Sequence, residues 1–132
     1  MLAQTTERLI DDYLSELIDR GNYARHFAEE ATFAIMGTDH EAEGRSAVEQ
    51  MIRYLHEEVF DATVECKNRF AAESHATLEA EFVGTHIGDF AGIAPTHRSV
   101  RVPYSVVYDV ENELISALRV YMPLNALVAQ MS

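Results

Sequence analysis

Two runs of alternating residues, joined by a glycine-rich segment, constrain the fold more than any other feature of the chain. Residues 77–86 and 99–110 place apolar side chains at every second position, which predicts two long strands with one face against a core. The segment between them, residues 87–98, is small and apolar, which is more typical of a flap than of a solvated turn. His86 continues the core-facing row at the end of the first run, so we expect its side chain to point inward.

Helical spacing of apolar residues precedes most of the strand-like alternation along the chain. The spacing predicts three helices in the first half, over 6–20, 22–28 and 46–56, and a closing helical turn over 124–131. Alternation predicts further strands over 31–37, 59–72 and 114–122. This order favours an α+β fold, with about three helices from the N-terminal half packed on one face of a curved antiparallel sheet. Long twisted strands with helices on the concave side would leave a cone, and the inward rows of the strands would line its wall.

Composition excludes several classes of protein. The chain has 132 residues, a length that fits one domain over 1–132, and its net charge of −12 repels nucleic acids and anionic membranes. No apolar run is long enough for a transmembrane helix, and the first residues do not resemble a signal peptide. The one cysteine, Cys66, fits a reducing cytoplasm. The histidines are scattered, so we expect neither a metal nor a cofactor.

Residues 84–98, GTHIGDFAGIAPTHR, resemble the signature of SnoaL-like polyketide cyclases, which belong to the superfamily of nuclear transport factors and ketosteroid isomerases. The segment departs from that signature at Ala94, where the family has proline, and at His97, where it has glycine. The resemblance extends to the order of elements along the chain. It implies a conical, cystatin-like α+β fold with an internal pocket, and members that commonly pair through the outer face of the sheet. We therefore expect a homodimer, and a monomeric mass in light scattering would contradict it.

His86 is the leading catalytic candidate, because histidine exchanges protons near neutral pH. The alternative is a buried histidine bonded to backbone or to a tyrosine. Tyr13 and Tyr104 are candidate donors to a developing enolate oxygen, or else core tyrosines whose hydroxyls reach water. Asn68 is predicted to face inward, where its amide meets either a ligand or the backbone. The side chains expected to bind a ligand are Leu14, Phe33, Ile35, Tyr54, Phe60, Asn68, Phe70, Phe82, Phe90, Tyr108 and Met122.

Two carboxylates that related proteins use are missing. SnoaL-like cyclases carry an acid–base aspartate near the end of the last strand, but residues 119–124 contain no acid. Ketosteroid isomerases carry a tyrosine on the first helix and a base after the first strand, where this chain has Leu14 and Ile35. Two functions remain open: a lyase or isomerase acting on a small hydrophobic carbonyl compound, such as a polyketide-like ring precursor, and a carrier or sensor that only binds a small hydrophobic molecule.

Overall fold

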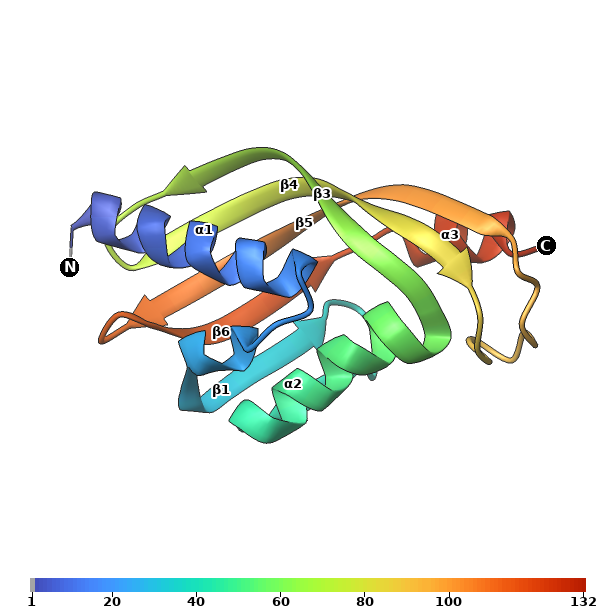
Figure 1. Cartoon of the computed structure of the whole chain (residues 1–132), viewed down its shortest axis with the longest axis horizontal. Coiled ribbons are helices and arrows are strands. Elements are labelled where there is room, and N and C mark those ends of the chain that lie inside the picture. Colours follow the sequence, from blue (N-terminus) through green and yellow to red (C-terminus); the bar gives the residue numbers. More distant parts are fainter. Residues whose placement is uncertain (1) are drawn as a thin grey trace.

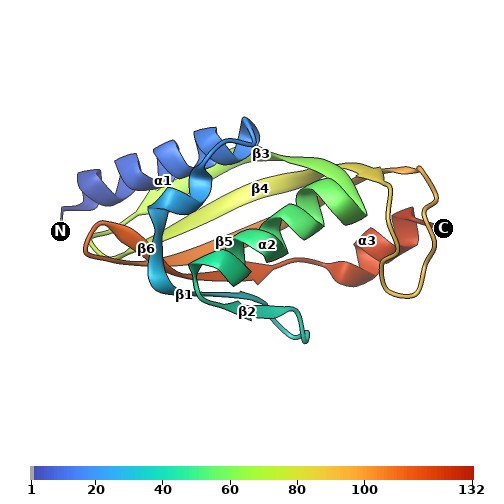
Figure 2. The same cartoon turned by 60° about the horizontal axis from the view of Figure 1, so that its bottom comes forward.

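The computed structural model describes residues 2–132 and contains helices on one face of a long, twisted sheet (Figure 1). The helical segments are α1 (Ala3–Ile18), the 3-10 turn η1 (Tyr23–His26), α2 (Arg45–Arg53), the π-helix η2 (Tyr54–Val59) and α3 (Leu124–Gln130). The strands are β1 (Phe27–Ile35), β2 (Glu41–Glu43), β3 (Phe60–Ala71), β4 (His75–His86), β5 (Ser99–Glu111) and β6 (Leu114–Tyr121). The turned view shows α1 and α2 over the same face, with α3 near the end where residues 87–98 form a loop (Figure 2).

The sheet has six strands in the order β2-β1-β6-β5-β4-β3, and it is not closed. The predicted α+β fold is confirmed, but the sheet is mixed because β1 runs parallel to β6. The other neighbouring strands are antiparallel. Short turns force antiparallel pairing only between strands that follow one another in the chain. Since β1 and β6 lie far apart in sequence, no local turn sets their relative direction.

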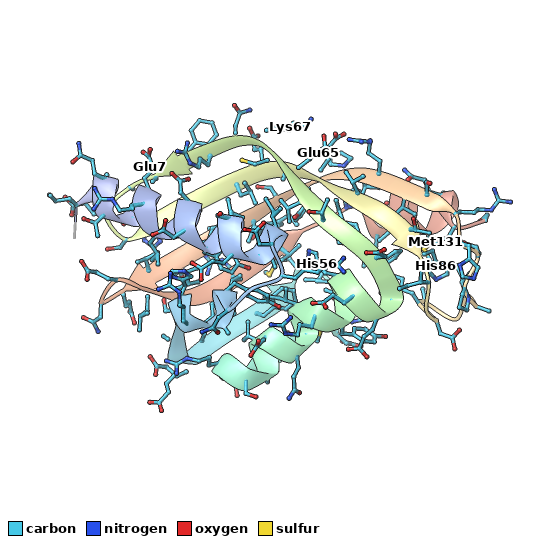
Figure 3. All side chains as sticks on the ribbon, in the orientation of Figure 1. Glu7, His56, Glu65, Lys67, His86 and Met131 are labelled. Atoms are coloured by element: carbon cyan, nitrogen blue, oxygen red, sulfur yellow. The ribbon has the colours of Figure 1, made fainter. Side chains whose placement is uncertain are left out.

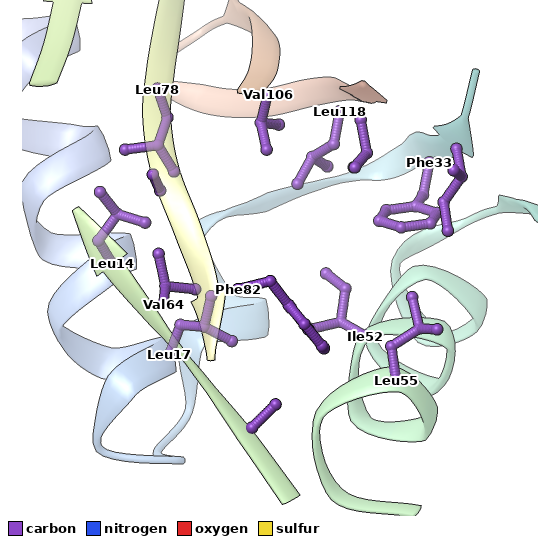
Figure 4. Close-up of a cluster of buried hydrophobic side chains, with 14 of the residues drawn as sticks. Leu14, Leu17, Phe33, Ile52, Leu55, Val64, Leu78, Phe82, Val106 and Leu118 are labelled. Atoms are coloured by element: carbon purple, nitrogen blue, oxygen red, sulfur yellow. The ribbon is translucent and has the colours of Figure 1, made fainter. Parts of the chain in front are cut away.

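The core lies between the helices and the inner face of the sheet. Helix α1 buries most of the stripe expected from its sequence, Ile10, Tyr13, Leu14 and Leu17, against β3 and β4, but Ile18 of the same expected stripe is exposed. Helix α2 adds Val48 and Ile52. Figure 4 shows side chains from the helices and from the sheet directed toward one shared interior. Burial of these rows is the main source of stability in a fold of this kind.

A β-bulge in β3 overturns the predicted inward position of Asn68 and Phe70. Cys66 pairs with Ala80 but Asn68 pairs with Glu79, so one extra residue is inserted into β3. Because side chains alternate between faces, one inserted residue moves all later side chains to the opposite face. Phe70 is therefore 60% exposed. The Asn68 amide donates to the Glu79 carboxylate at 3.3 Å outside the core.

Tyr54 is also on the outside, contrary to expectation, with 38% of its surface exposed. The inward stripe of this helical segment is formed by Val48, Ile52 and Leu55. Tyr54 lies two residues after Ile52, and at about 100° per residue this places it on the opposite side of the helix.

Two glycines of the 84–98 segment stand where no side chain fits. A Cβ on Gly84 would lie 2.4 Å from the backbone oxygen of Asp61, and one on Gly88 would lie 2.4 Å from that of Glu58. The close approach at Gly88 accompanies backbone hydrogen bonds from Ile87 and Gly88 to the Val59 carbonyl, at 2.8 and 2.9 Å. These glycines allow the end of β4 to press directly on the junction between η2 and β3.

Candidate functional site

A cavity lies at the centre of the core, bounded by α1, α2, η2, the inner face of the sheet and the start of α3. Its volume is about 50 Å³, measured as the space open to the centre of a water-sized sphere. That space holds a few water molecules. Its polar side chains are His56, Tyr13, Tyr104 and Tyr108, and the remaining lining is apolar: Leu14, Leu17, Phe33, Ile35, Ile52, Leu55, Phe60, Val64, Leu78, Phe82, Phe90, Val106, Leu118, Val120, Met122, Leu124 and Leu127.

Most of the residues expected at a ligand site line this cavity. The structure brings together Tyr13, Tyr104, Leu14, Phe33, Ile35, Phe60, Phe82, Phe90, Tyr108 and Met122. Tyr54, Asn68 and Phe70 lie outside, as described above. His86 is fully buried but is not among the lining residues. Figure 3 shows His86 at the loop end of the molecule and His56, which belongs to η2, nearer the middle.

His56 is the histidine that lines the cavity, and its position was not predicted. Its Nδ1 lies 2.9 Å from the Ile52 carbonyl oxygen on the same helical segment. A carbonyl oxygen can only accept, so Nδ1 carries a proton and the neutral ring keeps its lone pair on Nε2. Nε2 is buried and has no hydrogen-bond partner among residues 2–132. Burial lowers the pKa of His56 below its usual 6.5, which favours this neutral form.

A signal for His56 was present in the sequence. Val48, Ile52 and His56 are spaced four residues apart, so His56 continues the buried stripe of α2. The widening of α2 into the π-helix η2 could not be read from the sequence. Such π-helical turns are rare and often occur at functional sites.

Three tyrosines supply the remaining polar groups of the cavity. Their rings contact other aromatic rings, with centroids 6.0 Å apart for Tyr13 and Tyr108 and 6.2 Å apart for Phe82 and Tyr104. Phe82 also contacts His56, at 5.4 Å between centroids, so the Phe82 ring contacts both the histidine and Tyr104. Burial raises the pKa of each of the three phenols above its usual 10.0. They therefore remain protonated and can act as hydrogen-bond donors.

His86 anchors the loop formed by residues 87–98. The Thr96 backbone N–H donates to His86 Nδ1 at 3.2 Å, and the Thr96 hydroxyl lies 3.0 Å from the same nitrogen. The His86 backbone N–H also donates to Arg98 O at 3.0 Å, and His86 O accepts from His97 N–H at 2.9 Å. These contacts match the alternative of a buried histidine bonded to backbone. Its catalytic role stays a prediction.

Replacing His86 by alanine is expected to destabilise the fold by about 3 kcal/mol, since it leaves a cavity and unpairs the Thr96 N–H. His86→Asn should cost clearly less, because the asparagine oxygen can accept the bond that Nδ1 accepts. Urea unfolding of both variants measures the difference. Equal losses would show that the bond to Thr96 contributes little. Loss of activity in a stable asparagine variant would instead favour the catalytic prediction.

The sequence matches one known protein family along almost its whole length. The family model of SnoaL-like polyketide cyclases matches residues 8–131. The chain belongs to the SnoaL-like polyketide cyclase family. No curated protein sequence matches it.

Solved structures share the SnoaL-like fold along nearly the whole chain. A protein assigned to the polyketide cyclases, from Xanthomonas campestris pv. campestris, has a TM-score of 0.87 at 16% identity, over 98% of each chain. TsrD from Streptomyces laurentii has a TM-score of 0.82 at 17% identity, over 100% of this chain and 98% of its own. A protein of ketosteroid isomerase-like fold from Catenulispora acidiphila, in complex with trimethylamine, has a TM-score of 0.76 at 17% identity, over 93% and 91%. These likenesses establish the fold.

The structure explains one departure from the SnoaL-like signature. His97, where the signature has glycine, adopts a φ of +57°. This left-handed conformation costs a non-glycine residue about 1–2 kcal/mol. The glycine of the family signature thus matches a backbone requirement of the loop, and this chain meets the requirement at a cost.

A further difference from the family lies outside residues 84–98 and concerns the acid–base group of the cavity. Where SnoaL-like cyclases carry the aspartate, after β6, this chain places Met122 and Leu124 in the cavity wall. No Asp or Glu lines the cavity within the described residues. Within residues 2–132 there is also no cluster of His, Cys, Asp and Glu suited to a metal ion, and no helix with the length and apolarity to cross a membrane. Among the described residues that line the cavity, His56 is the one whose side chain can take up a proton near neutral pH.

Proposed function

We propose that this protein is a lyase or isomerase that acts by acid–base chemistry on a small hydrophobic carbonyl compound bound in the central cavity. The observation that carries the proposal is His56, whose unprotonated Nε2 is buried without a partner in the cavity wall. A buried polar atom without a partner costs about 1–3 kcal/mol. Native proteins contain few such groups, and a catalytic role is one reason for which they are retained. Tyr23 and His86 also have a buried polar atom without a partner within residues 2–132, but neither lines the cavity.

The proposed reaction begins with transfer of a proton from the carbon beside the carbonyl group to His56 Nε2. The electron pair of the broken C–H bond moves into the carbonyl group and gives an enolate oxygen. The hydroxyl of Tyr104 or Tyr13 donates to that oxygen, which is stabilisation of the kind that an oxyanion hole supplies. In a substrate whose enolate is conjugated with a C=C bond, return of the proton from His56 to the far carbon of that bond gives an isomer. In a substrate with a second carbonyl group, attack of the enolate carbon on that group closes a ring, and the alkoxide formed takes the proton back from His56.

Exchange of substrate protons with solvent tests the proposal directly. We expect the protein to catalyse deuterium uptake from D₂O at the carbon beside the carbonyl of small neutral cyclic ketones or β-keto esters, measured by proton NMR. A matched sample without protein gives the uncatalysed rate. Absence of exchange across such a panel would contradict the proposal.

A carrier or sensor is the second candidate function, and the absence of a carboxylate from the cavity wall favours it. The small volume, about 50 Å³, requires the interior to expand around any guest larger than a few waters. Native mass spectrometry separates the two candidates. A small molecule that co-purifies with the protein, with no proton exchange in any compound tested, would favour the carrier.

The proposal also includes two expectations from the sequence, that the protein forms a homodimer and that it works in a reducing compartment. Charged pairs such as Arg101 with Glu65 and Glu81 cross the outer face of the sheet, at 3.1 and 2.7 Å. Tyr121 on the same sheet is exposed. Aromatic residues such as tyrosine are enriched in interfaces and polar residues surround them, so Tyr121 favours pairing of two copies, with the charged pairs at the rim of the contact. The mass in solution tests the dimer.

A further inference from the structure

Arg20 occupies a position at the end of α1 where glycine is the usual residue. Its N–H donates to Leu17 O at 3.1 Å, and the Gly21 N–H donates to Glu16 O at 2.8 Å. This pair of bonds ends a helix through one residue in the left-handed conformation, most often glycine. Arg20 has that conformation, with a φ of +56°, at a cost of about 1–2 kcal/mol. Glycine follows only at the next position.

The side chain of Arg20 gives a reason for the strained position. Its Nη2 donates to the Asp61 carboxylate at 2.6 Å, to the His56 carbonyl at 3.3 Å and to the Ala62 carbonyl at 3.3 Å. One guanidinium group thus connects the end of α1 with η2 and the start of β3. The bond to His56 is made at the backbone, so it fixes the part of η2 from which the imidazole projects.

We propose that Arg20 is a positioning residue for His56, holding the π-helical turn of η2 so that the imidazole is presented to the cavity. The inference rests on the proposed function, in which His56 accepts the proton. Strained backbone conformations persist where the surrounding structure requires them and are concentrated at functional sites. Here the strain directs an arginine side chain to the backbone of the residue that supplies the base.

Arg20 also affects the pKa of His56 through its charge. Burial is the main cause of the lowered pKa of His56, the positive charge of Arg20 lowers it further, and the negative charge of Glu57 raises it. Asp61 is ion-paired to Arg20, and Arg53 is ion-paired to Glu57. Removing the Arg20 side chain takes away a positive charge that counteracts the effect of the Glu57 and Asp61 carboxylates on the His56 ring. The pKa of His56 should then rise.

The test uses Arg20→Gly, which relieves the strained conformation and so favours folding even as it removes the side chain. An NMR titration of the His56 ring should give a higher pKa than in the wild type. The rate of substrate proton exchange should fall by about tenfold to a hundredfold, with KM little changed, because the base is no longer held in place. Arg20→Lys should keep the low pKa, since it keeps the charge, while the exchange rate still falls.

Asp61→Asn is the matched control, because it removes the same ion pair and keeps the Arg20 bond to the His56 carbonyl. It also removes a negative charge, so the pKa of His56 should move down instead of up. Wild-type titration and ring chemical shifts of His56 in a folded Arg20→Gly variant would overturn the proposal and leave Arg20 as a helix-ending residue only. The titration requires no turnover. If the protein catalyses no exchange, the proposed function fails while the effect of Arg20 on His56 can still be read.

Discussion

Replacing His56 by glutamine is expected to lower the rate of substrate proton exchange by about a hundredfold to ten-thousandfold, the usual contribution of a general base. Glutamine is polar and of similar length, but it has no nitrogen that can take up a proton near neutral pH. The wild-type rate should rise with pH through the lowered pKa of His56 and level off above it, because the neutral ring is the active form. The variant should lose this rise.

Stability measurements distinguish a lost base from a damaged fold. His56→Phe removes a buried nitrogen that has no partner among the described residues, and it also removes the bond from Nδ1 to the Ile52 carbonyl. These two effects oppose each other, so we expect stability in urea within about 1 kcal/mol of the wild type, together with the same loss of exchange. His75→Gln is the matched control, because His75 is exposed and pairs with Asp109 at 3.0 Å, away from the cavity. Its exchange rate should equal that of the wild type. Full activity in His56→Gln would remove His56 from the mechanism.

Replacing Gly84 by alanine is expected to destabilise the fold by about 3 kcal/mol, at the upper end of the cost of overpacking. The added Cβ would lie 2.4 Å from Asp61 O and 2.7 Å from both the Cα and the Cβ of Ala62. Backbone atoms of a paired strand cannot rotate away as a flexible side chain can. The melting temperature should fall by about 10 °C for a domain of this size.

Gly21→Ala is the control for the effect of glycine itself. Its nearest neighbour to an added Cβ is Glu16 O at 3.7 Å, an ordinary contact. Its stability should therefore stay within about 0.5 kcal/mol of the wild type or rise slightly, since alanine restricts the unfolded chain. Calorimetry of both variants decides the comparison. A loss in Gly84→Ala no larger than that in Gly21→Ala would mean that β3 and β4 can separate without cost.

The fold was largely predictable because its signals are local. The stripe of α1 and the alternation of β4 and β5 each follow from the period of one element, and the structure buries the same faces. The mixed sheet was not predicted, because the pairing of β1 with β6 depends on residues distant in sequence. The same holds for the bulge in β3. The side chain of Lys67 carries no mark that an extra residue is inserted there.

The candidate site was predictable in its walls and not in its chemistry. Apolar rows such as Phe33 with Ile35, and Phe82 on β4, line the cavity because the hydrophobic effect places such rows inside any fold of this type. His86 has the stronger sequence signal, but its Nδ1 accepts from Thr96, so Nε2 of the neutral ring carries the proton, and this Nε2–H has no partner within residues 2–132. His56 has the weaker signal, but its Nδ1 faces a carbonyl oxygen, so the Nε2 that has no partner among the same residues keeps the lone pair.

By itself the sequence determined the order of helices and strands, the faces that are buried and the SnoaL-like character of residues 84–98. These depend on periodicity and on backbone freedom, which are properties of neighbouring residues. The tertiary structure alone decided which histidine meets the cavity and which holds the loop. The availability of a nitrogen depends on the donors and acceptors brought to it from the rest of the chain, and the packing of distant elements sets those contacts.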